Sequence, residues 1–122
     1  METLCITGGQ PLHGTLAVQG SKNAVLPLLA AAAAVPGRSV LLGCPSIRDL
    51  RVSCALLEGL GLSCRAAGDT LFLDAAAPPR TDPDPALAGQ LRSSVLLLGA
   101  LLGRCAQAEI PLPGGCVLGA RP

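Results

Sequence analysis

The sequence predicts a mixed α/β fold of the α+β kind, in which helices and short strands alternate along one domain. Short apolar runs that end at glycine indicate strands, and two longer apolar segments with helical spacing indicate buried helices. The chain has 122 residues, of which 50% are hydrophobic, so it can bury the core of one ordinary domain. A partial repeat of the same pattern indicates that the domain is built from similar units.

The composition argues against several classes of protein. The net charge is +1 and Phe72 is the only aromatic residue, so we expect no nucleic-acid partner. Six cysteines without a C-x-x-C pair, and a single histidine, argue against a metal site, and nothing indicates a cofactor. The start lacks a secretory signal, and the longest apolar run, residues 24–35, is shorter than the roughly 20 residues of a membrane span. We therefore expect a cytoplasmic protein with reduced thiols and no membrane partner.

The first third of the chain is predicted to contain three strands and one helix. Residues 4–6 form a short apolar strand, and residues 13–19 alternate in the manner of a second. A helix follows with Ser21 as its cap and runs to Ala34, where a Pro-Gly pair stops it. Residues 39–42 form the third strand.

The middle of the chain is predicted to be a helix followed by a hairpin. Ser46 begins the helix with Asp49 as its capping-box partner, and two glycines end it. Strands over residues 62–66 and 70–73 then flank a Gly-Asp pair that is typical of a hairpin turn. The apolar face of the helix comprises Ile47, Leu50, Cys54 and Leu57.

The last third is predicted to be a loop, a long helix and a strand. Four prolines make residues 75–85 a loop, and an almost wholly apolar segment predicts a buried helix over 87–104. A strand over residues 109–112 follows, and a glycine-rich loop begins at Pro113.

The chain matches itself when it is shifted by 92 − 22 = 70 positions. Lys22 then falls on Arg92, Val40 on Ile110 and Ser46 on Cys116, so that a helix matches a helix and a strand matches a strand. We interpret the unit as β-α-β-α-β-β. The first copy is complete to about residue 85, and the second begins at residue 86 and is partial.

The segment around Lys22 is the first candidate binding site. It joins a strand to a helix start, where free backbone N–H groups and the helix dipole favour an anion, and Lys22 adds a full positive charge. Pro27 has no N–H, so the carbonyl of Asn23 loses its helical partner. The same residues also suit a solvated lysine beside an ordinary helix cap.

Arg92 and Cys116 complete the candidate site. Arg92 is the repeat counterpart of Lys22 at the start of an apolar helix, and it is either a second anion ligand or a surface arginine whose stem covers apolar atoms. Cys116 lies among glycines just before an expected helix start, and Arg121 is nearby. Both features lower a thiol pKa, although the pattern also suits a loop thiol without a role.

Three separated segments together resemble the UDP-N-acetylglucosamine 1-carboxyvinyltransferases, within the enolpyruvyl transferase (EPSP synthase-like) family. They are Gly-Ser-Lys-Asn-Ala at 20–24, Leu-Arg-Ser-Ser at 91–94, and Pro-Gly-Gly-Cys with Gly-Ala-Arg-Pro at 113–122. The order and spacing agree, as does Ile-Thr-Gly-Gly at 6–9, so the resemblance covers nearly the whole chain.

The resemblance implies a reaction and a role for each candidate residue. The family transfers enolpyruvyl from phosphoenolpyruvate to the 3-hydroxyl of UDP-N-acetylglucosamine and releases phosphate, which begins peptidoglycan precursor synthesis. By resemblance, Lys22, Asn23 and Arg121 bind phosphoenolpyruvate, while Asn23, Arg92, Arg121 and Pro122 bind the nucleotide sugar. Cys116 is the catalytic proton donor and the thiol that fosfomycin alkylates.

The resemblance also implies how the domain is organised. Family members are inside-out α/β barrels of two lobes, each built from three β-α-β-α-β-β repeats. Residues 1–20 would be strands belonging to the other lobe, and residues 21–122 would be part of one lobe. We therefore expect an N-terminal fragment that is inactive alone, because the catalytic base and the opposite lobe lie in a missing C-terminal part, which is a further expected partner.

Two alternatives remain at the level of sequence. The first is the sister enzyme 3-phosphoshikimate 1-carboxyvinyltransferase, against which Asn23 and Cys116 argue. The second is a non-catalytic fragment that binds a nucleotide sugar or a partner chain. The presence of Lys22, Arg92, Cys116 and Arg121 argues against a decayed copy.

Overall fold

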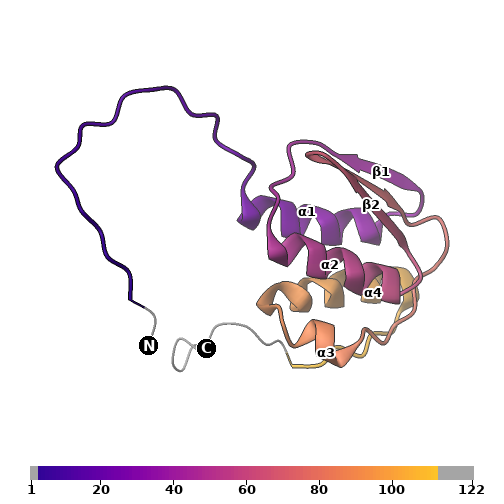
Figure 1. Cartoon of the computed structure of the whole chain (residues 1–122). Coiled ribbons are helices and arrows are strands. Elements are labelled where there is room, and N and C mark those ends of the chain that lie inside the picture. Colours follow the sequence, from indigo (N-terminus) through magenta and orange to yellow (C-terminus); the bar gives the residue numbers. More distant parts are fainter. Residues whose placement is uncertain (1–2, 113–122) are drawn as a thin grey trace.

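The computed structural model describes residues 3–112 and has a helix layer on one face of a three-stranded sheet (Figure 1). This arrangement confirms the predicted mixed fold class. Within the described residues, no helix is both long and apolar enough to cross a membrane. The elements are α1 (Lys22–Ala34), β1 (Arg38–Leu41), α2 (Arg48–Gly59), β2 (Ser63–Ala67), β3 (Thr70–Asp74), α3 (Pro85–Ala88), the 3-10 turn η1 (Arg92–Val95) and α4 (Leu96–Cys105).

The sheet has the strand order β1-β3-β2, and both pairings are antiparallel. β2 and β3 form the predicted hairpin, and the positive φ of 61° at Gly68 in its turn is a conformation that glycine adopts without strain. Phe72 pairs with Val40 on one side and Arg65 on the other. The Arg65 guanidinium lies 4.9 Å from the Phe72 ring centroid and covers this exposed face.

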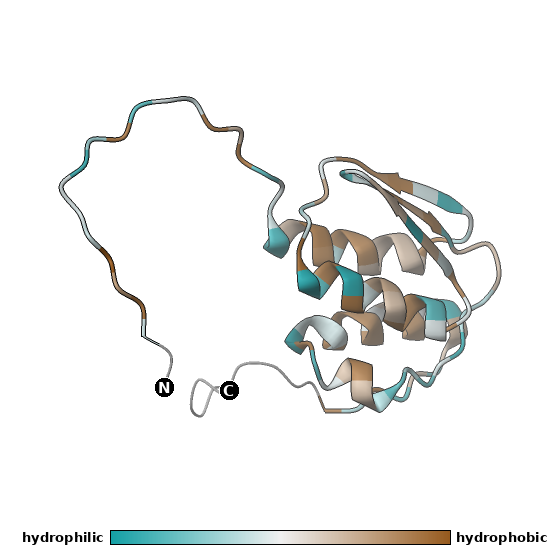
Figure 2. Cartoon of the chain, in the orientation of Figure 1, coloured by the Kyte–Doolittle hydropathy of each residue, from teal (hydrophilic) through white to brown (hydrophobic). Residues whose placement is uncertain are grey.

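The core lies between the other face of the sheet and the helices. Leu71 and Leu73 of the central strand are 1% and 2% exposed, because alternate residues of a strand point to the same side. α1 and α2 lie nearest the sheet, and α4 packs against α1 (Figure 1). Hydrophobic residues run along most of α1 and α4, whereas α2 also carries hydrophilic ones (Figure 2). The largest fully buried side chains are Leu29, Leu56, Leu57, Leu60, Leu71 and Leu73.

The strands predicted over residues 4–6 and 13–19 are not formed. Residues 3–20 run as an extended, exposed segment away from the domain (Figure 1), and Ile6 and Leu16 are 80% and 87% exposed. A strand needs a neighbour to receive its backbone hydrogen bonds, and the described part of this chain offers none to this segment. The alternation of apolar residues therefore indicates only that these segments favour a strand, and a strand forms only where a partner strand is available.

One predicted helix cap is at the expected residue and the other is displaced by one position. Ser21 is the N-cap residue of α1, although its side chain makes no capping hydrogen bond. The cap position of α2 is Ile47 rather than Ser46, and Asp49 pairs with Lys22 instead of closing a capping box. Asp49 still lies in the first turn of α2, where a carboxylate is favoured by the helix dipole.

The helix predicted over 87–104 is divided into α3, η1 and α4. The Asp84 side chain accepts a hydrogen bond from Ala86 N at 2.7 Å, so a short helix starts early, and Leu91 then adopts an extended conformation. The Ser94 hydroxyl donates to the Leu91 carbonyl at 2.8 Å and stabilises the break. The strand predicted over 109–112 is also absent: Glu109 N donates to Thr81 O at 2.9 Å, but no ladder forms.

Arg104 joins the end of α4 to two other segments. Its guanidinium donates to the Ala33 carbonyl at 3.2 Å and to the Ala77 carbonyl at 3.0 Å. A cation at this place satisfies carbonyls that have no helical partner at the end of α1. Arg104 therefore joins the C-terminal end of α4 to the C-terminal end of α1 and to the loop that follows β3.

Replacement of Leu57 with alanine tests the position of the core. Leu57 is 1% exposed, so Leu57→Ala should lower the free energy of unfolding by about 2–5 kcal/mol through lost burial and a residual cavity. Leu28→Ala, at a leucine of α1 that is 54% exposed, is the matched control and should change it by less than about 0.5 kcal/mol. Urea unfolding followed by circular dichroism measures both; equal losses would contradict the assigned core.

Candidate functional site

The N-terminal ends of α1, α2 and the η1–α4 segment lie at one end of the molecule. All three run in the same direction from the side where the extended segment enters (Figure 1). Two side-chain contacts join these starts. Lys22 at the start of α1 forms an ion pair with Asp49 of α2, and Arg48 donates to the Gln90 side-chain oxygen at 2.7 Å, just before η1.

The start of α1 is held by close backbone packing. A Cβ on Gly20 would overlap the Gly43 carbonyl oxygen and lie 3.3 Å from Pro45 Cδ, so only glycine fits there. The Gly43 loop is itself fixed, because Cys44 N donates to Asp69 O of the hairpin turn at 2.7 Å. The hairpin thus determines where α1 begins and where Lys22 lies.

The first turn of α1 has several features of an anion site. It contains no acidic residue, and 55% of the Lys22 side chain is accessible to solvent. Pro27 lies inside the helix and has no N–H to donate to the Asn23 carbonyl. Free N–H groups at a helix start, together with a lysine, favour a phosphate or carboxylate at this place.

Arg92 lies at the start of the matching segment. It is the first residue of η1 and is exposed, whereas Ser94, two residues later, is 2% exposed. Ser93 and Ser94 line a small cavity of about 20 Å³ together with residues of α1 and α2, so η1 packs against both helices. Lys22 and Arg92 are each the first residue of their element, in agreement with the repeat, although Arg92 starts a 3-10 turn rather than the predicted α-helix.

The structure therefore brings three of the sequence-predicted site residues, Lys22, Asn23 and Arg92, to one end of the fold. Cys116, Arg121 and Pro122 lie outside the described residues. Among residues 3–112, no cluster of three or more His, Cys, Asp or Glu side chains could hold a metal ion.

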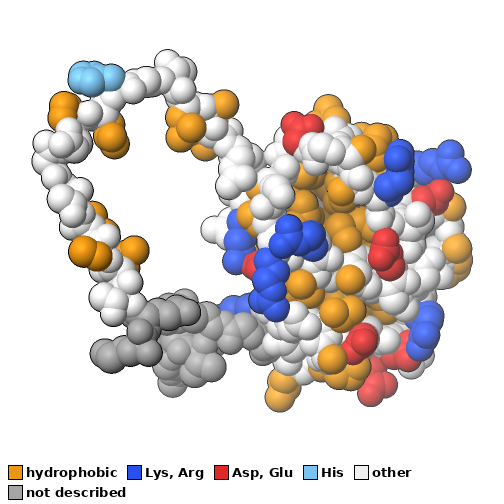
Figure 3. Space-filling model, viewed as in Figure 1, with side chains coloured by type: hydrophobic (Ala, Val, Ile, Leu, Met, Phe, Trp, Pro, Cys, Tyr) orange, Lys and Arg blue, Asp and Glu red, His pale blue; other side chains and the backbone are white. Residues whose placement is uncertain are grey.

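Three residues at this end were not assigned to the site from sequence. Arg48 and Gln90 meet across 42 positions of the chain, and Asp49 was interpreted as a local cap. The only sequence signal was the placement of Arg48 and Asp49 at a helix start, which does not identify a distant partner. Lys and Arg side chains gather on the face of the molecule beside the extended segment (Figure 3), and Asp49 partly offsets this positive charge.

Comparisons with known proteins identify the relatives of the chain. The family model of EPSP synthase (3-phosphoshikimate 1-carboxyvinyltransferase) matches residues 6–122. A UDP-N-acetylglucosamine 1-carboxyvinyltransferase of Mycobacterium bovis is 42% identical over 121 residues, which are 99% of this chain and 29% of the relative. The enzyme of the same name from Solidesulfovibrio magneticus is 42% identical over 122 residues, again covering 29% of its length.

A solved structure agrees with these sequence relatives. The enolpyruvyl transferase NikO of Streptomyces tendae superposes with a TM-score of 0.76 at 29% sequence identity, over 83% of this chain and 24% of that one. The chain thus spans less than a third of the length of the curated relatives it matches.

Replacement of Gly20 with alanine tests how the start of α1 is positioned. Gly20→Ala should lower the free energy of unfolding by about 1–3 kcal/mol, because the new methyl group must displace the backbone at Gly43. Gly59→Ala is the control, since a Cβ there meets nothing within 4 Å and alanine favours a helix. Thermal unfolding compares the two, and an unperturbed Gly20→Ala protein would refute the proposed packing.

Proposed function

Because the chain belongs to the enolpyruvyl transferase family, we propose that it is the N-terminal part of a UDP-N-acetylglucosamine 1-carboxyvinyltransferase. In this proposal the complete enzyme transfers enolpyruvyl from phosphoenolpyruvate to the 3-hydroxyl of UDP-N-acetylglucosamine and releases phosphate. The observation that carries the proposal is the arrangement of Lys22 and Arg92 at parallel helix starts, in a chain 42% identical to enzymes of that name. The product would enter peptidoglycan synthesis, and we propose a cytoplasmic location.

Lys22 and Asn23 would hold the phosphate end of phosphoenolpyruvate at the start of α1. The ammonium group and the free N–H groups of the first turn offer charge-assisted hydrogen bonds, which are stronger than neutral ones. The ion pair with Asp49 orients Lys22 without occupying all three of its donors. Arg121 would supply a second cation for the same substrate.

The nucleotide sugar would bind across the neighbouring helix start. Arg92 is exposed at the first residue of η1, where its guanidinium can pair with a diphosphate in two parallel hydrogen bonds. Asn23, Arg121 and Pro122 would complete this site by resemblance to the family. The two substrates would therefore lie side by side above parallel helix starts.

Cys116 would be the catalytic acid. Its thiol would donate a proton to the methylene carbon of phosphoenolpyruvate, and the sugar hydroxyl would add to the neighbouring carbon. The new methyl group would then lose a proton as phosphate leaves that neighbouring carbon, which restores the double bond, with cations stabilising the phosphate throughout. The base that accepts the hydroxyl proton would come from the part of the enzyme outside this chain. Residues 1–20 would pair with strands of the other lobe, and the extended path of residues 3–20 is compatible with such pairing.

The sister activity, 3-phosphoshikimate 1-carboxyvinyltransferase, gives its name to the matching family model. The curated relatives at 39–42% identity are instead named for the nucleotide-sugar enzyme. Asn23 and the cysteine loop at Cys116 also favour that activity. A purely binding role for the fragment has no observation in its favour beyond its length.

Replacement of Lys22 in the complete enzyme tests the proposed function. The assay measures phosphate released from phosphoenolpyruvate and UDP-N-acetylglucosamine, and Lys22→Ala should lower kcat by about 10²–10³-fold through loss of one charge-assisted donor. Arg38→Ala removes a cation that pairs with Asp74 on the sheet, so it should leave turnover unchanged. A complete enzyme that releases phosphate only with shikimate 3-phosphate as acceptor would overturn the assignment.

Fosfomycin labelling tests the role of Cys116. Its phosphonate resembles the phosphate of the substrate, so Lys22 and Arg121 would hold it while the Cys116 thiolate opens the epoxide. Mass spectrometry of the complete enzyme, treated together with nucleotide sugar, should find the adduct on Cys116. Cys116→Asp should keep turnover and resist the drug, because a carboxylic acid donates a proton but attacks an epoxide poorly. Labelling of Cys44 or Cys105 instead would contradict this role.

A further inference from the structure

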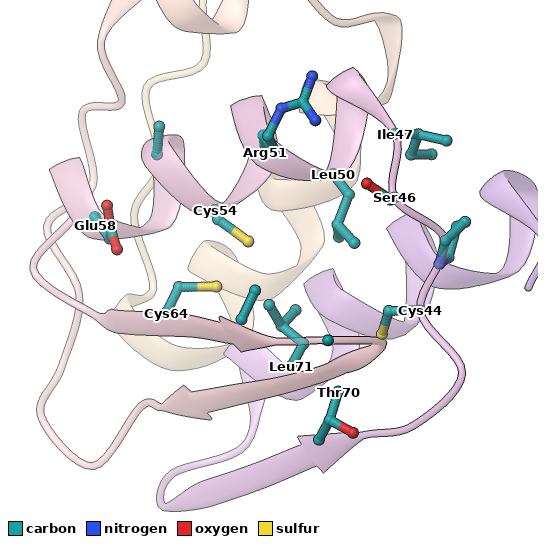
Figure 4. A pocket seen from close by; sticks show the side chains of 14 residues that line it. Cys44, Ser46, Ile47, Leu50, Arg51, Cys54, Glu58, Cys64, Thr70 and Leu71 are labelled. Atoms are coloured by element: carbon teal, nitrogen blue, oxygen red, sulfur yellow. The ribbon is translucent and has the colours of Figure 1, made fainter.

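A pocket that begins at the N-terminal end of α2 and extends along that helix contains three of the six cysteines. It has a volume of about 290 Å³ and lies between α2 and the β2–β3 hairpin (Figure 4). Cys44, Cys54 and Cys64 line it, together with apolar residues and the charged side chains of Arg51 and Glu58. None of the three thiols has a role in the proposed transfer reaction, so their grouping requires its own explanation.

The fold directs two of these thiols toward each other. Cys54 lies on α2, and Cys64 is the second residue of β2, on the sheet face that also presents Leu73 to the helices. The chain between them reverses at Gly61, whose φ of 89° only glycine adopts readily. Figure 4 shows the sulfur atoms of Cys54 and Cys64 pointing toward one another across the pocket, and both residues are half-buried.

The remaining described cysteines lack such a partner. The Cys44 thiol donates to the Leu41 carbonyl at 3.5 Å, and burial raises its pKa. The Cys105 thiol, which does not line this pocket, donates to the Pro79 carbonyl at 3.5 Å. Cys5 is exposed on the extended segment. The pocket therefore contains one facing pair and one thiol that is held by the backbone.

The two facing thiols differ in the ease with which they lose a proton. The hydrogen bond from the Cys64 side chain lowers the pKa of Cys54, against the opposing effects of burial and of Glu58. The same hydrogen bond, together with burial, raises the pKa of Cys64. Because the two sulfur atoms face one another, a Cys54 sulfur that has formed a mixed disulfide lies within reach of attack by Cys64.

We propose that Cys54 and Cys64 form a dithiol site that small-molecule disulfides oxidise to an intramolecular disulfide joining α2 to β2. The Cys54 thiolate attacks one sulfur of the small disulfide, forms a mixed disulfide and releases one thiolate. Cys64 then loses its proton and attacks the Cys54 sulfur, which expels the second small thiolate. Two protein thiols are oxidised and one small disulfide is reduced to two thiols, so the exchange is balanced and reversible.

The sequence provides an internal control for this proposal. Cys54 is separated by ten positions from Cys64 (64 − 54 = 10) and also from Cys44 (54 − 44 = 10). Loop-closure entropy depends on the length of the loop, so an unfolded chain would form the two disulfides with similar ease. A preference for the pair Cys54–Cys64 must therefore come from the folded structure.

The experiment treats the reduced 122-residue chain with glutathione disulfide, blocks free thiols with iodoacetamide and digests with trypsin. Arg51 and Arg65 bracket a single peptide, residues 52–65, that contains Cys54 and Cys64 and no other cysteine. We expect this peptide to appear without alkylation and lighter by two hydrogen atoms than the dithiol form. Dithiothreitol should restore both alkylation sites, and Cys44→Ser should leave the result unchanged.

Two further arms make the outcome decisive. Cys64→Ser should stop the exchange halfway and leave one glutathione on Cys54, since the second nucleophile is missing. In urea the yield of the disulfide 54–64 should fall to that of 44–54. The proposal is overturned if residues 52–65 remain fully alkylated, if 44–54 forms as readily as 54–64 in native buffer, or if the preference persists in urea.

Discussion

The burial of Leu71 and Leu73 against the helices is the contact on which the rest of the structure depends. These two side chains of β3 fix the sheet on the helix layer, and the hairpin turn that follows from their register holds the loop at Gly43. That loop in turn receives Gly20 and sets the first turn of α1. The position of Lys22 is thus a consequence of core packing, communicated through backbone contacts rather than through its own side chain.

The elements that sequence alone predicted well are those whose causes are local. A Gly-Asp pair between two short apolar runs was enough to predict the hairpin. A continuous apolar segment with a break on either side was enough to predict α1. The divided helix was missed because its causes are an aspartate cap at Asp84 and an extended Leu91, which an apolar pattern conceals. The strand predictions over residues 4–6 and 13–19 failed because pairing is a property of two segments, and one segment cannot reveal whether its neighbour exists.

The residues of the candidate site also divide into those that the sequence could identify and those that it could not. The internal repeat singled out Lys22 and Arg92, because equivalent positions in two copies of a unit lie in equivalent places on the fold. The contacts that join these starts, Lys22 to Asp49 and Arg48 to Gln90, could not be predicted, since each depends on how two helices pack. The orientation of Cys54 toward Cys64 could not be predicted either. Their spacing can be counted in the sequence, but the chain reversal at Gly61 that turns one thiol toward the other is seen only in the structure.

Arg104 offsets the helix dipoles at one end of the helix layer only. Helices that run side by side in one direction align their dipoles, which repel, and the cation at the Ala33 carbonyl relieves this repulsion at the C-terminal ends only. At the opposite ends, Asp49 lies in the first turn of α2 and pairs with Lys22, while the first turn of α1 contains no acidic residue. An anionic substrate bound at the proposed site would be the electrostatic counterpart of Arg104. Its binding would be thermodynamically linked to the folding of the domain, so that its concentration would help to determine how much of the chain is folded.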